Sequence, residues 1–282
     1  MSPPGLKTAT MPASAKRPVI DGLVYFSDGD PEPLHTGGVT AANITVTHMH
    51  WDLHQTFDAM AQWLNRVRAP GSGWKLILRA DDIAAAQSEG RTGLIMGWQN
   101  TLPFESNLDL VTAFHALGLR VAQLTHDEAN FAGDGCMEPR GAGLTGFGRE
   151  LVAAMNAAGV AIDQSHCCDA TAAAAARTSS KPVFLTHANA KAVNDRPRNK
   201  SDDTLRLVAD TGGVIGTSIH GFMNWDGDPA HPPTLENWIR HVRHVADLCG
   251  IEHVGIGTDF SAVRDEASVT SILEFSKGRY AA

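Results

Sequence analysis

The sequence predicts an α/β protein whose fold is a (β/α)8 TIM barrel, and three observations support this. Short apolar, β-branched runs alternate with longer helical patterns, and this alternation is typical of βα units that build a parallel sheet. Eight such runs can be placed along the chain, and the chain of 282 residues is near the usual size of one barrel. A doubly wound open sheet is the alternative, but no G-x-G-x-x-G fingerprint follows the first run.

The expected strands and helices alternate along the chain. The strands are expected at 19–25, 42–47, 93–98, 120–125, 160–164, 182–186, 214–218 and 253–257. The helices are expected at 56–67 and 81–89, which both precede the third strand, and then at 108–117, 148–158, 169–178, 202–209, 235–249 and 266–275. Gly159 falls where a helix should stop, and Asp169 and Ser201 are expected N-caps.

Composition restricts the class of protein and its partners. Residues 1–18 are rich in Pro, Ser, Ala and Lys and are expected to be a disordered lead-in to one barrel domain at 19–282. The net charge of −8 is unlike the basic footprint of a nucleic-acid-binding protein. Because there is neither a signal-like apolar stretch nor a run long enough to span a bilayer, we expect a cytoplasmic protein without a membrane partner. The 4 cysteines show no C-x-x-C spacing and are expected to be free thiols.

Polar side chains follow six of the eight expected strands. In chain order they are Gln99 and Asn100, His126, Ser165 and His166, His187 and Asn189, His220, and Asp259. In a barrel these positions converge on one face. Neutral imidazoles and a carboxylate suit zinc, which lowers the pKa of a bound water and polarises a carbonyl. A nearby aspartate can accept the proton, so position alone suggests metal-assisted hydrolysis.

Three further clusters carry alternative interpretations. His48 and His50 have the H-x-H spacing of a ligand pair, but they otherwise read as residues lining a loop. Arg198 and its basic neighbours are either a surface charge patch or a clamp for a substrate carboxylate. His241 and His244 are expected on a solvated helix face.

Several stretches together resemble the membrane (renal) dipeptidase family of zinc peptidases. They are QLTHDEAN at 123–130, GLTGFGRELVAAMNAAGVAIDQSH at 143–166, PVFLTHANA at 182–190, RPRNKSDD at 196–203, TGGVIG at 211–216 and HVGIGTDF at 253–260. They occur in the order that the family has, over about half of the chain. The resemblance implies an amidohydrolase-like barrel, zinc as cofactor, a small peptide-like substrate and a homodimer.

The resemblance also implies which residues hold metal. His166 and His187 match the two histidines that bind the second zinc of the family. The histidine and aspartate of the first zinc correspond to Leu23 and Tyr25, and the bridging glutamate corresponds to Gln99. Leucine and tyrosine cannot replace those ligands, and a neutral amide is a poor one. We therefore expect a reduced site with one zinc ion, for which Gln99 and Asp259 are further candidate ligands.

Four residues are expected to serve the substrate and the reaction. By resemblance, His126 contacts the substrate and stabilises the tetrahedral intermediate, and Arg198 grips the substrate carboxylate. Asn130, at the end of the first matching stretch, is a further candidate for substrate binding. Asp259 matches the aspartate that handles the proton, although Phe-Ser-Ala follows it here where the family has Phe-Asp-Gly.

Three functions follow from these patterns. The first is a one-metal hydrolase of a dipeptide or a related small amide that bears a carboxylate. The second is an ordinary two-metal dipeptidase that recruits His48 and His50. The third is a metal-free pseudoenzyme or small-carboxylate-binding protein on the same barrel. Metal-free acid–base chemistry by Asp259 and His126 is a fourth option without a positive sign in the sequence.

Overall fold

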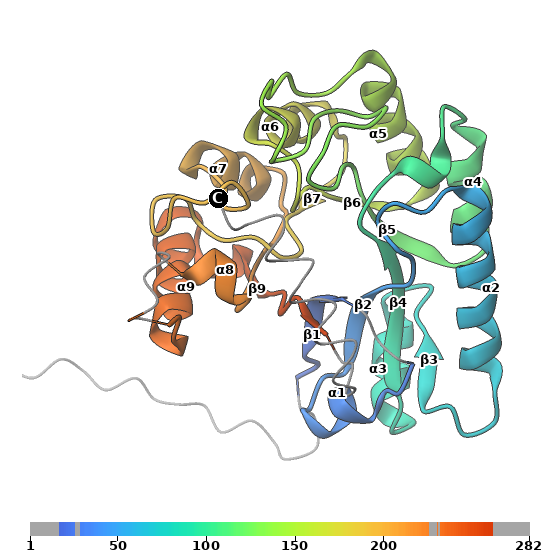
Figure 1. Cartoon of the computed structure of the whole chain (residues 1–282). Coiled ribbons are helices and arrows are strands. Elements are labelled where there is room, and N and C mark those ends of the chain that lie inside the picture. The colour runs from blue at the N-terminus through green and yellow to red at the C-terminus, as the bar shows by residue number, and fades with distance from the viewer. Residues whose placement is uncertain (1–16, 26–28, 226–229, 231, 262–282) are drawn as a thin grey trace, which may run out of the picture.

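Parallel strands form a curved wall in the middle of the molecule, with helices on its outside (Figure 1). The structure is a computed structural model that describes residues 17–25, 29–225, 230 and 232–261. The strands are β1 (Ile20–Tyr25), β2 (Ala41–Thr45), β3 (Trp74–Leu76), β4 (Thr92–Trp98), β5 (Leu119–Gln123), β6 (Ala161–Asp163), β7 (Val183–Phe184), β8 (Ile215–Thr217), β9 (Val254–Ile256) and β10 (Phe260–Ser261). The α-helices are α1 (Glu32–Thr36), α2 (Leu53–Arg68), α3 (Asp81–Ser88), α4 (Asp109–Ala116), α5 (Gly146–Ala158), α6 (Asp169–Thr178), α7 (Asp202–Asp210), α8 (Gly221–Asn224) and α9 (Leu235–Cys249).

The strands close into a barrel. The main sheet has the order β10-β1-β2-β4-β5-β6-β7, and all of its strand pairs are parallel. The short strand β3 pairs with the first three residues of β4. A parallel bridge between Leu185 and Ile215 joins β7 to the β8-β9 pair. The ring closes onto β1 because the Asp259 N–H donates to the Leu23 carbonyl at 3.0 Å. The carboxyl ends of the strands therefore meet at one face, as they do in barrel enzymes generally.

The eight predicted strands are confirmed, with ends that differ by at most two residues. The short elements β3, β10, α1 and α8 were not predicted, because segments of two to five residues carry too few positions to show a hydrophobic period. The helix predicted at 266–275 lies outside the described residues. The lead-in predicted at 1–18 does so as well, apart from Arg17 and Pro18, which are exposed.

The helix ends mostly follow the predicted signals. Gly159 ends α5 in the left-handed conformation at φ 82°, which costs glycine little because it has no Cβ. The Ser201 hydroxyl caps α7 by accepting from the Thr204 N–H at 3.4 Å. The prediction of Asp169 as a cap is wrong: Cys168 precedes α6, and its Sγ accepts from the Thr171 N–H. Asp169 instead occupies the first turn of α6, where its negative charge interacts favourably with the positive end of the helix dipole.

His241 corrects another prediction. It was expected in solvent, but its side chain is buried and its Nδ1 accepts from the Ala190 N–H at 3.2 Å. The reason is the register of α9: His241 and Val245 are one turn apart on the face that packs inward. His244, three residues along, lies at the edge of this face and contacts the Asp202 carboxylate at 2.7 Å.

The described cysteines are all free, as predicted, and Cys167 is fully buried. No helix of the described residues is both long and apolar enough to cross a bilayer.

Candidate metal centre

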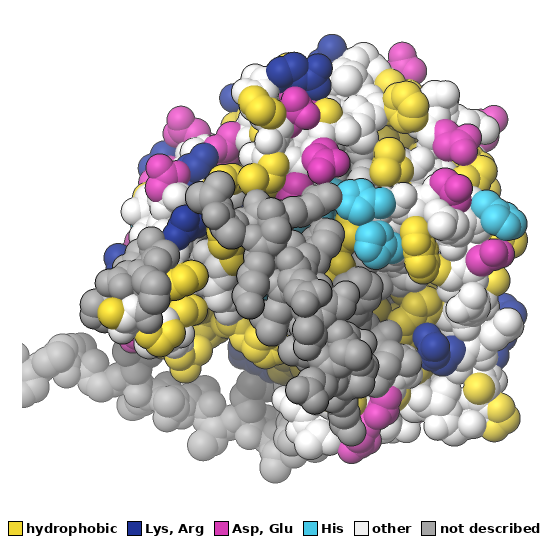
Figure 2. All heavy atoms as spheres, in the orientation of Figure 1, with side chains coloured by type: hydrophobic (Ala, Val, Ile, Leu, Met, Phe, Trp, Pro, Cys, Tyr) yellow, Lys and Arg dark blue, Asp and Glu magenta, His cyan; other side chains and the backbone are white. Residues whose placement is uncertain are grey.

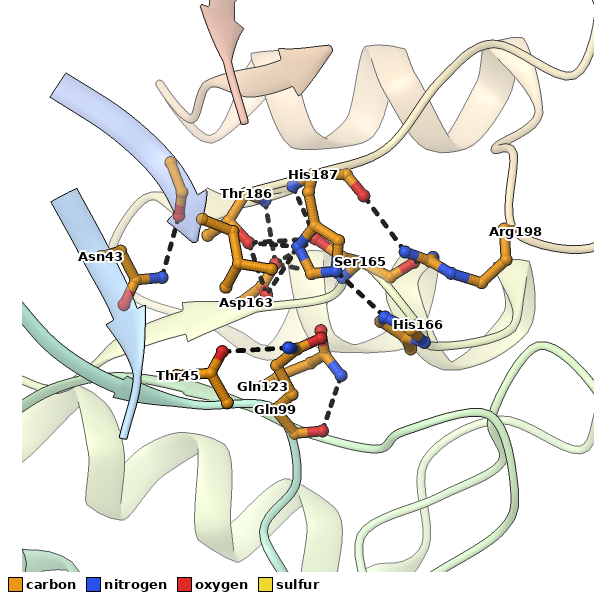
Figure 3. Close-up of polar contacts among 12 residues, drawn as sticks. Asn43, Thr45, Gln99, Gln123, Asp163, Ser165, His166, Thr186, His187 and Arg198 are labelled. Atoms are coloured by element: carbon orange, nitrogen blue, oxygen red, sulfur yellow. Dashed lines mark hydrogen bonds and ion pairs between the residues drawn. The ribbon is translucent and has the colours of Figure 1, made fainter. Parts of the chain in front are cut away.

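The ends of two neighbouring strands bring His166 and His187 face to face. His166 follows β6 and His187 follows β7, and their Nε2 atoms are 3.0 Å apart (Figure 3). Both side chains are almost completely buried. The predicted convergence of these two imidazoles is therefore present in the structure.

A carboxylate fixes the His166 ring. The Nδ1 atom of His166 lies 2.6 Å from Oδ1 of Asp127, which is buried. Burial alone would raise the pKa of Asp127, but the hydrogen bond from His166 and the positive charge of Arg198 act against burial, and the pKa lies well below its usual range. An ionised carboxylate can only accept, so Nδ1 of His166 carries the hydrogen. Its Nε2 is left with the lone pair.

A hydroxyl and a second carboxylate fix the His187 ring. The Thr186 hydroxyl donates to Oδ2 of Asp163 at 2.7 Å and lies 2.8 Å from Nδ1 of His187. Because its hydrogen is used on Asp163, the Thr186 oxygen accepts from the His187 Nδ1–H. Burial raises the pKa of Asp163, and four hydrogen bonds from Ser165 and Thr186 counter this shift. The His187 Nε2 is thus also left with a lone pair.

Two lone pairs that face each other at 3.0 Å can both bind one cation placed between them. Burial, followed by the charge of Arg198, lowers the pKa of both His166 and His187 well below the ordinary value, so both rings are neutral. Neutral imidazoles are good metal ligands. Two nitrogens on one tetrahedral zinc ion would lie about 3.3 Å apart, close to the observed separation. The donor set therefore fits a bound metal ion.

His126 and Asp127 border this pair. The His126 ring stacks on the His166 ring, with centroids 3.9 Å apart and planes at 26°. The side chains of His126, Asp127 and His166 offer ligand atoms within 4.8 Å of one another. The 2.6 Å between Asp127 and His166 is a charge-assisted hydrogen-bond distance and is too short for an ion between them. Asp127 was not among the residues predicted for the site, although its position directly after a strand-end histidine is a signal in the sequence.

Arg198 and Asn130 make contacts other than those predicted. The buried Arg198 guanidinium donates to the backbone carbonyls of Ser165 and His187. The Asn130 amide stabilises its own loop, because it donates to the Leu124 carbonyl at 2.8 Å and accepts from the Ala132 N–H at 2.7 Å. Arg198 thus lies against the backbone of both imidazole-bearing segments, whereas Asn130 supports the loop beside them. Their roles toward substrate remain predictions.

The positions that correspond to the first zinc site of the family hold non-ligand side chains. Leu23 is buried, and the Tyr25 hydroxyl contacts Met49 Sδ at 3.7 Å. The buried Gln99 donates from Nε2 to the Thr45 hydroxyl at 2.9 Å, and it is drawn beside Gln123, below the imidazole pair, in Figure 3. Its role as a ligand remains a prediction.

Asp259 lies where the last strands meet β1. Its backbone has φ 55°, which is uncommon for a residue other than glycine. Burial raises the pKa of Asp259, and the charges of His220 and Arg198 partly oppose this shift. A carboxyl group with a raised pKa takes up a proton more readily than an ordinary aspartate does.

Two more histidines, His48 and His50, lie near His126 at the edge of the centre. The His48 and His50 ring centroids are 5.5 Å apart, and those of His50 and His126 are 6.2 Å apart. His48 is half-buried and accepts from the His50 N–H through Nδ1 at 3.3 Å, whereas the His50 side chain is exposed. Histidine side chains also lie side by side near the middle of the face shown in Figure 2.

A closed parallel barrel with paired imidazoles at the carboxyl ends of its strands defines an amidohydrolase-like protein. The chain belongs to the membrane dipeptidase family (peptidase family M19), whose model matches residues 36–271. This confirms the resemblance found in the sequence. The family to which the chain belongs is one of dipeptidases.

Individual proteins agree with this assignment. Dipeptidase verJ of Clonostachys rogersoniana is 35% identical over 181 residues, which are 64% of this chain and 46% of that protein. The chain thus spans about half the length of this relative. An amidohydrolase from Pseudomonas aeruginosa superimposes with a TM-score of 0.81 at 32% identity, over 89% of this chain and 77% of its own. A metallo peptidase from Rhodobacter sphaeroides, solved with a phosphinate mimic of the dipeptide L-Ala-D-Ala, shares the fold with a TM-score of 0.78 at 20% identity, over 92% of each chain.

Proposed function

We propose that this protein hydrolyses a dipeptide, or a related small amide that bears a carboxylate, with a single zinc ion held by His166 and His187. The observation that carries the proposal is the 3.0 Å approach of two Nε2 lone pairs. Zinc suits this site because it accepts neutral nitrogen ligands and has no strong geometric preference. With two protein nitrogens on the ion, coordination positions stay open for water and substrate.

The reaction would draw on both the ion and the chain. When bound, the ion would lower the pKa of a water molecule and polarise the scissile carbonyl. Asp259 would hold the proton taken from water and return it to the leaving amine, and its raised pKa favours uptake of that proton. His126, which stacks on His166, would donate a hydrogen bond to the oxyanion. The positive charge of Arg198 would favour a substrate carboxylate.

Side chains of β1 and of the residue that follows β4 support the proposal of a single ion. Leu23, Tyr25 and Gln99 stand where the family has a histidine, an aspartate and a bridging glutamate, and none of them supplies negative charge. A second dication beside the first would therefore lack the anion that separates the two charges. His48 and His50 are the alternative source of ligands for a second ion, and a metal count distinguishes the two cases.

The test is a dipeptide panel that includes L-Ala-D-Ala, assayed with zinc-loaded protein. We expect hydrolysis that a chelator abolishes and added zinc restores. His187→Ala should lose turnover, whereas His54→Ala, which alters an exposed histidine of α2, should retain it. Absence of turnover on every dipeptide would overturn the proposal. If a dipeptide then stabilised the protein equally with and without chelator, the result would indicate a metal-free binding protein.

A further inference from the structure

We propose that Asp127 is a positioning residue for the metal centre: it holds His166 in the tautomer and orientation that aim Nε2 at His187. It also supplies the negative charge that the centre lacks because Gln99 replaces a glutamate. This inference rests on the proposed metal site and assigns a role to a residue outside the matched ligand set.

The contact between Asp127 and His166 is direct. Their 2.6 Å separation and the burial of both side chains describe a charge-assisted hydrogen bond shielded from water. The carboxylate–histidine–metal arrangement fixes the ring and raises the basicity of the ligating nitrogen. His187 is linked to a carboxylate indirectly, because the Thr186 hydroxyl lies between its Nδ1 atom and Asp163 and is hydrogen-bonded to both. Each imidazole thus has its own carboxylate.

The chain holds the two partners together through the loop that follows β5. The Met137 N–H donates to the Asp127 carbonyl at 2.8 Å, and the Cys136 N–H donates to the His166 carbonyl at 2.7 Å. Adjacent residues of one loop therefore anchor the backbone of both partners. Gly135 makes this close approach possible, because a Cβ there would lie 2.1 Å from the His126 carbonyl oxygen. The Cys136 thiol also donates to Oδ1 of Asp127 at 3.4 Å.

The charges favour the same role. A dication in a buried site needs nearby anions, and Arg198 adds a positive charge to the surroundings of both histidines. Asp127 and Asp163 are the carboxylates that contact the imidazole pair, directly and through Thr186. Together they bring two carboxyl groups close to the proposed site of the ion.

The test compares Asp127→Asn and Asp127→Ala with Asp134→Asn. Asp134 is a matched control because it is a buried aspartate of the same loop whose carboxylate accepts from Arg140 and from the Ala142 N–H instead of an imidazole. Zinc affinity is measured by competition with a chromophoric chelator. The tautomer of His166 is read from its ¹⁵N chemical shifts in metal-free protein. Loss of a carboxylate that supports a ligating histidine typically weakens metal binding about 10- to 100-fold.

We expect about a 10-fold loss for Asp127→Asn and about a 100-fold loss for Asp127→Ala, with wild-type affinity for Asp134→Asn. In Asp127→Ala, the ¹⁵N shifts should show that His166 has lost its uniform Nδ1–H form. Wild-type affinity and an unchanged tautomer in both Asp127 variants would overturn the inference, even if their melting temperatures fall. Neither readout requires turnover, so wild-type protein that binds zinc without hydrolysing a dipeptide would refute the proposed function alone. Should wild-type protein bind no zinc, the tautomer measurement still decides the positioning role.

Discussion

Nε2 of His166 and Nε2 of His187 point at each other across 3.0 Å, and the Nδ1 atom of each ring is hydrogen-bonded on its far side. This arrangement leaves two lone pairs in one buried space. Burial and Arg198 oppose protonation of either ring. A metal ion satisfies both nitrogens without protonating them.

Asp163 should be more important for stability than a surface aspartate. Its Oδ1 accepts from the Ser165 hydroxyl at 2.6 Å and from the Thr186 N–H at 2.9 Å. Asp163→Asn replaces a carboxylate oxygen with an NH2 group. This group cannot accept the hydrogen bonds that Ser165 and Thr186 donate. We expect the free energy of unfolding to fall by about 2–4 kcal/mol, measured by urea denaturation. Asp58→Asn, at an exposed position of α2, should stay within about 0.5 kcal/mol of wild type. An equal effect of the two substitutions would show that the Asp163 network does not stabilise the fold.

His241 should make stability depend on pH. Burial lowers its pKa from 6.5 to about 4, with a smaller contribution from Arg240. Because the unfolded chain binds the proton more tightly, this histidine contributes stability that is fully present above pH 6.5 and is lost as the pH falls towards 4. Wild-type protein should lose about 2 kcal/mol more than His241→Asn between about pH 7 and about pH 5. Urea denaturation at several pH values checks this. Parallel pH profiles for the two proteins would contradict the assignment.

Asp259 should affect the reaction and leave the metal in place. Asp259→Asn keeps the size of the side chain and removes its capacity to carry a proton. We expect kcat to fall about 100- to 10,000-fold, while KM and zinc affinity stay at wild-type values. Steady-state kinetics on the best dipeptide of the panel, together with zinc competition, gives all three quantities. A loss of zinc affinity would instead make Asp259 a ligand, and the proton role would then be wrong.

The strands and the imidazole pair could be predicted from the sequence because both follow from local patterns. Apolar runs mark the strands, and a histidine directly after a strand must lie at the carboxyl end of a barrel. His166 and His187 were found in this way. The resemblance then separated them from other histidines, such as those of α9.

The rest depends on tertiary contacts that no local pattern shows. Asp127 lies beside His166 because the loop after β5 folds back along the segment after β6, where Gly135 pairs with Cys167. A buried face and a solvated face of α9 differ only in helix register, so His241 was placed in solvent. Arg198 donates to backbone carbonyls, and Asn130 bonds both backbone groups and side chains of neighbouring loops. The positions of these partners become known only when the loops are folded.

The most direct test of the paired-imidazole centre is a crystal structure of zinc-loaded protein with anomalous data at the zinc edge. The account predicts one anomalous peak per chain, within about 2.0–2.1 Å of Nε2 of both His166 and His187, and loss of that peak in His187→Ala. Two peaks per chain would instead support the two-metal dipeptidase. A structure without a peak between the two rings, from protein saturated with zinc, would contradict the central claim.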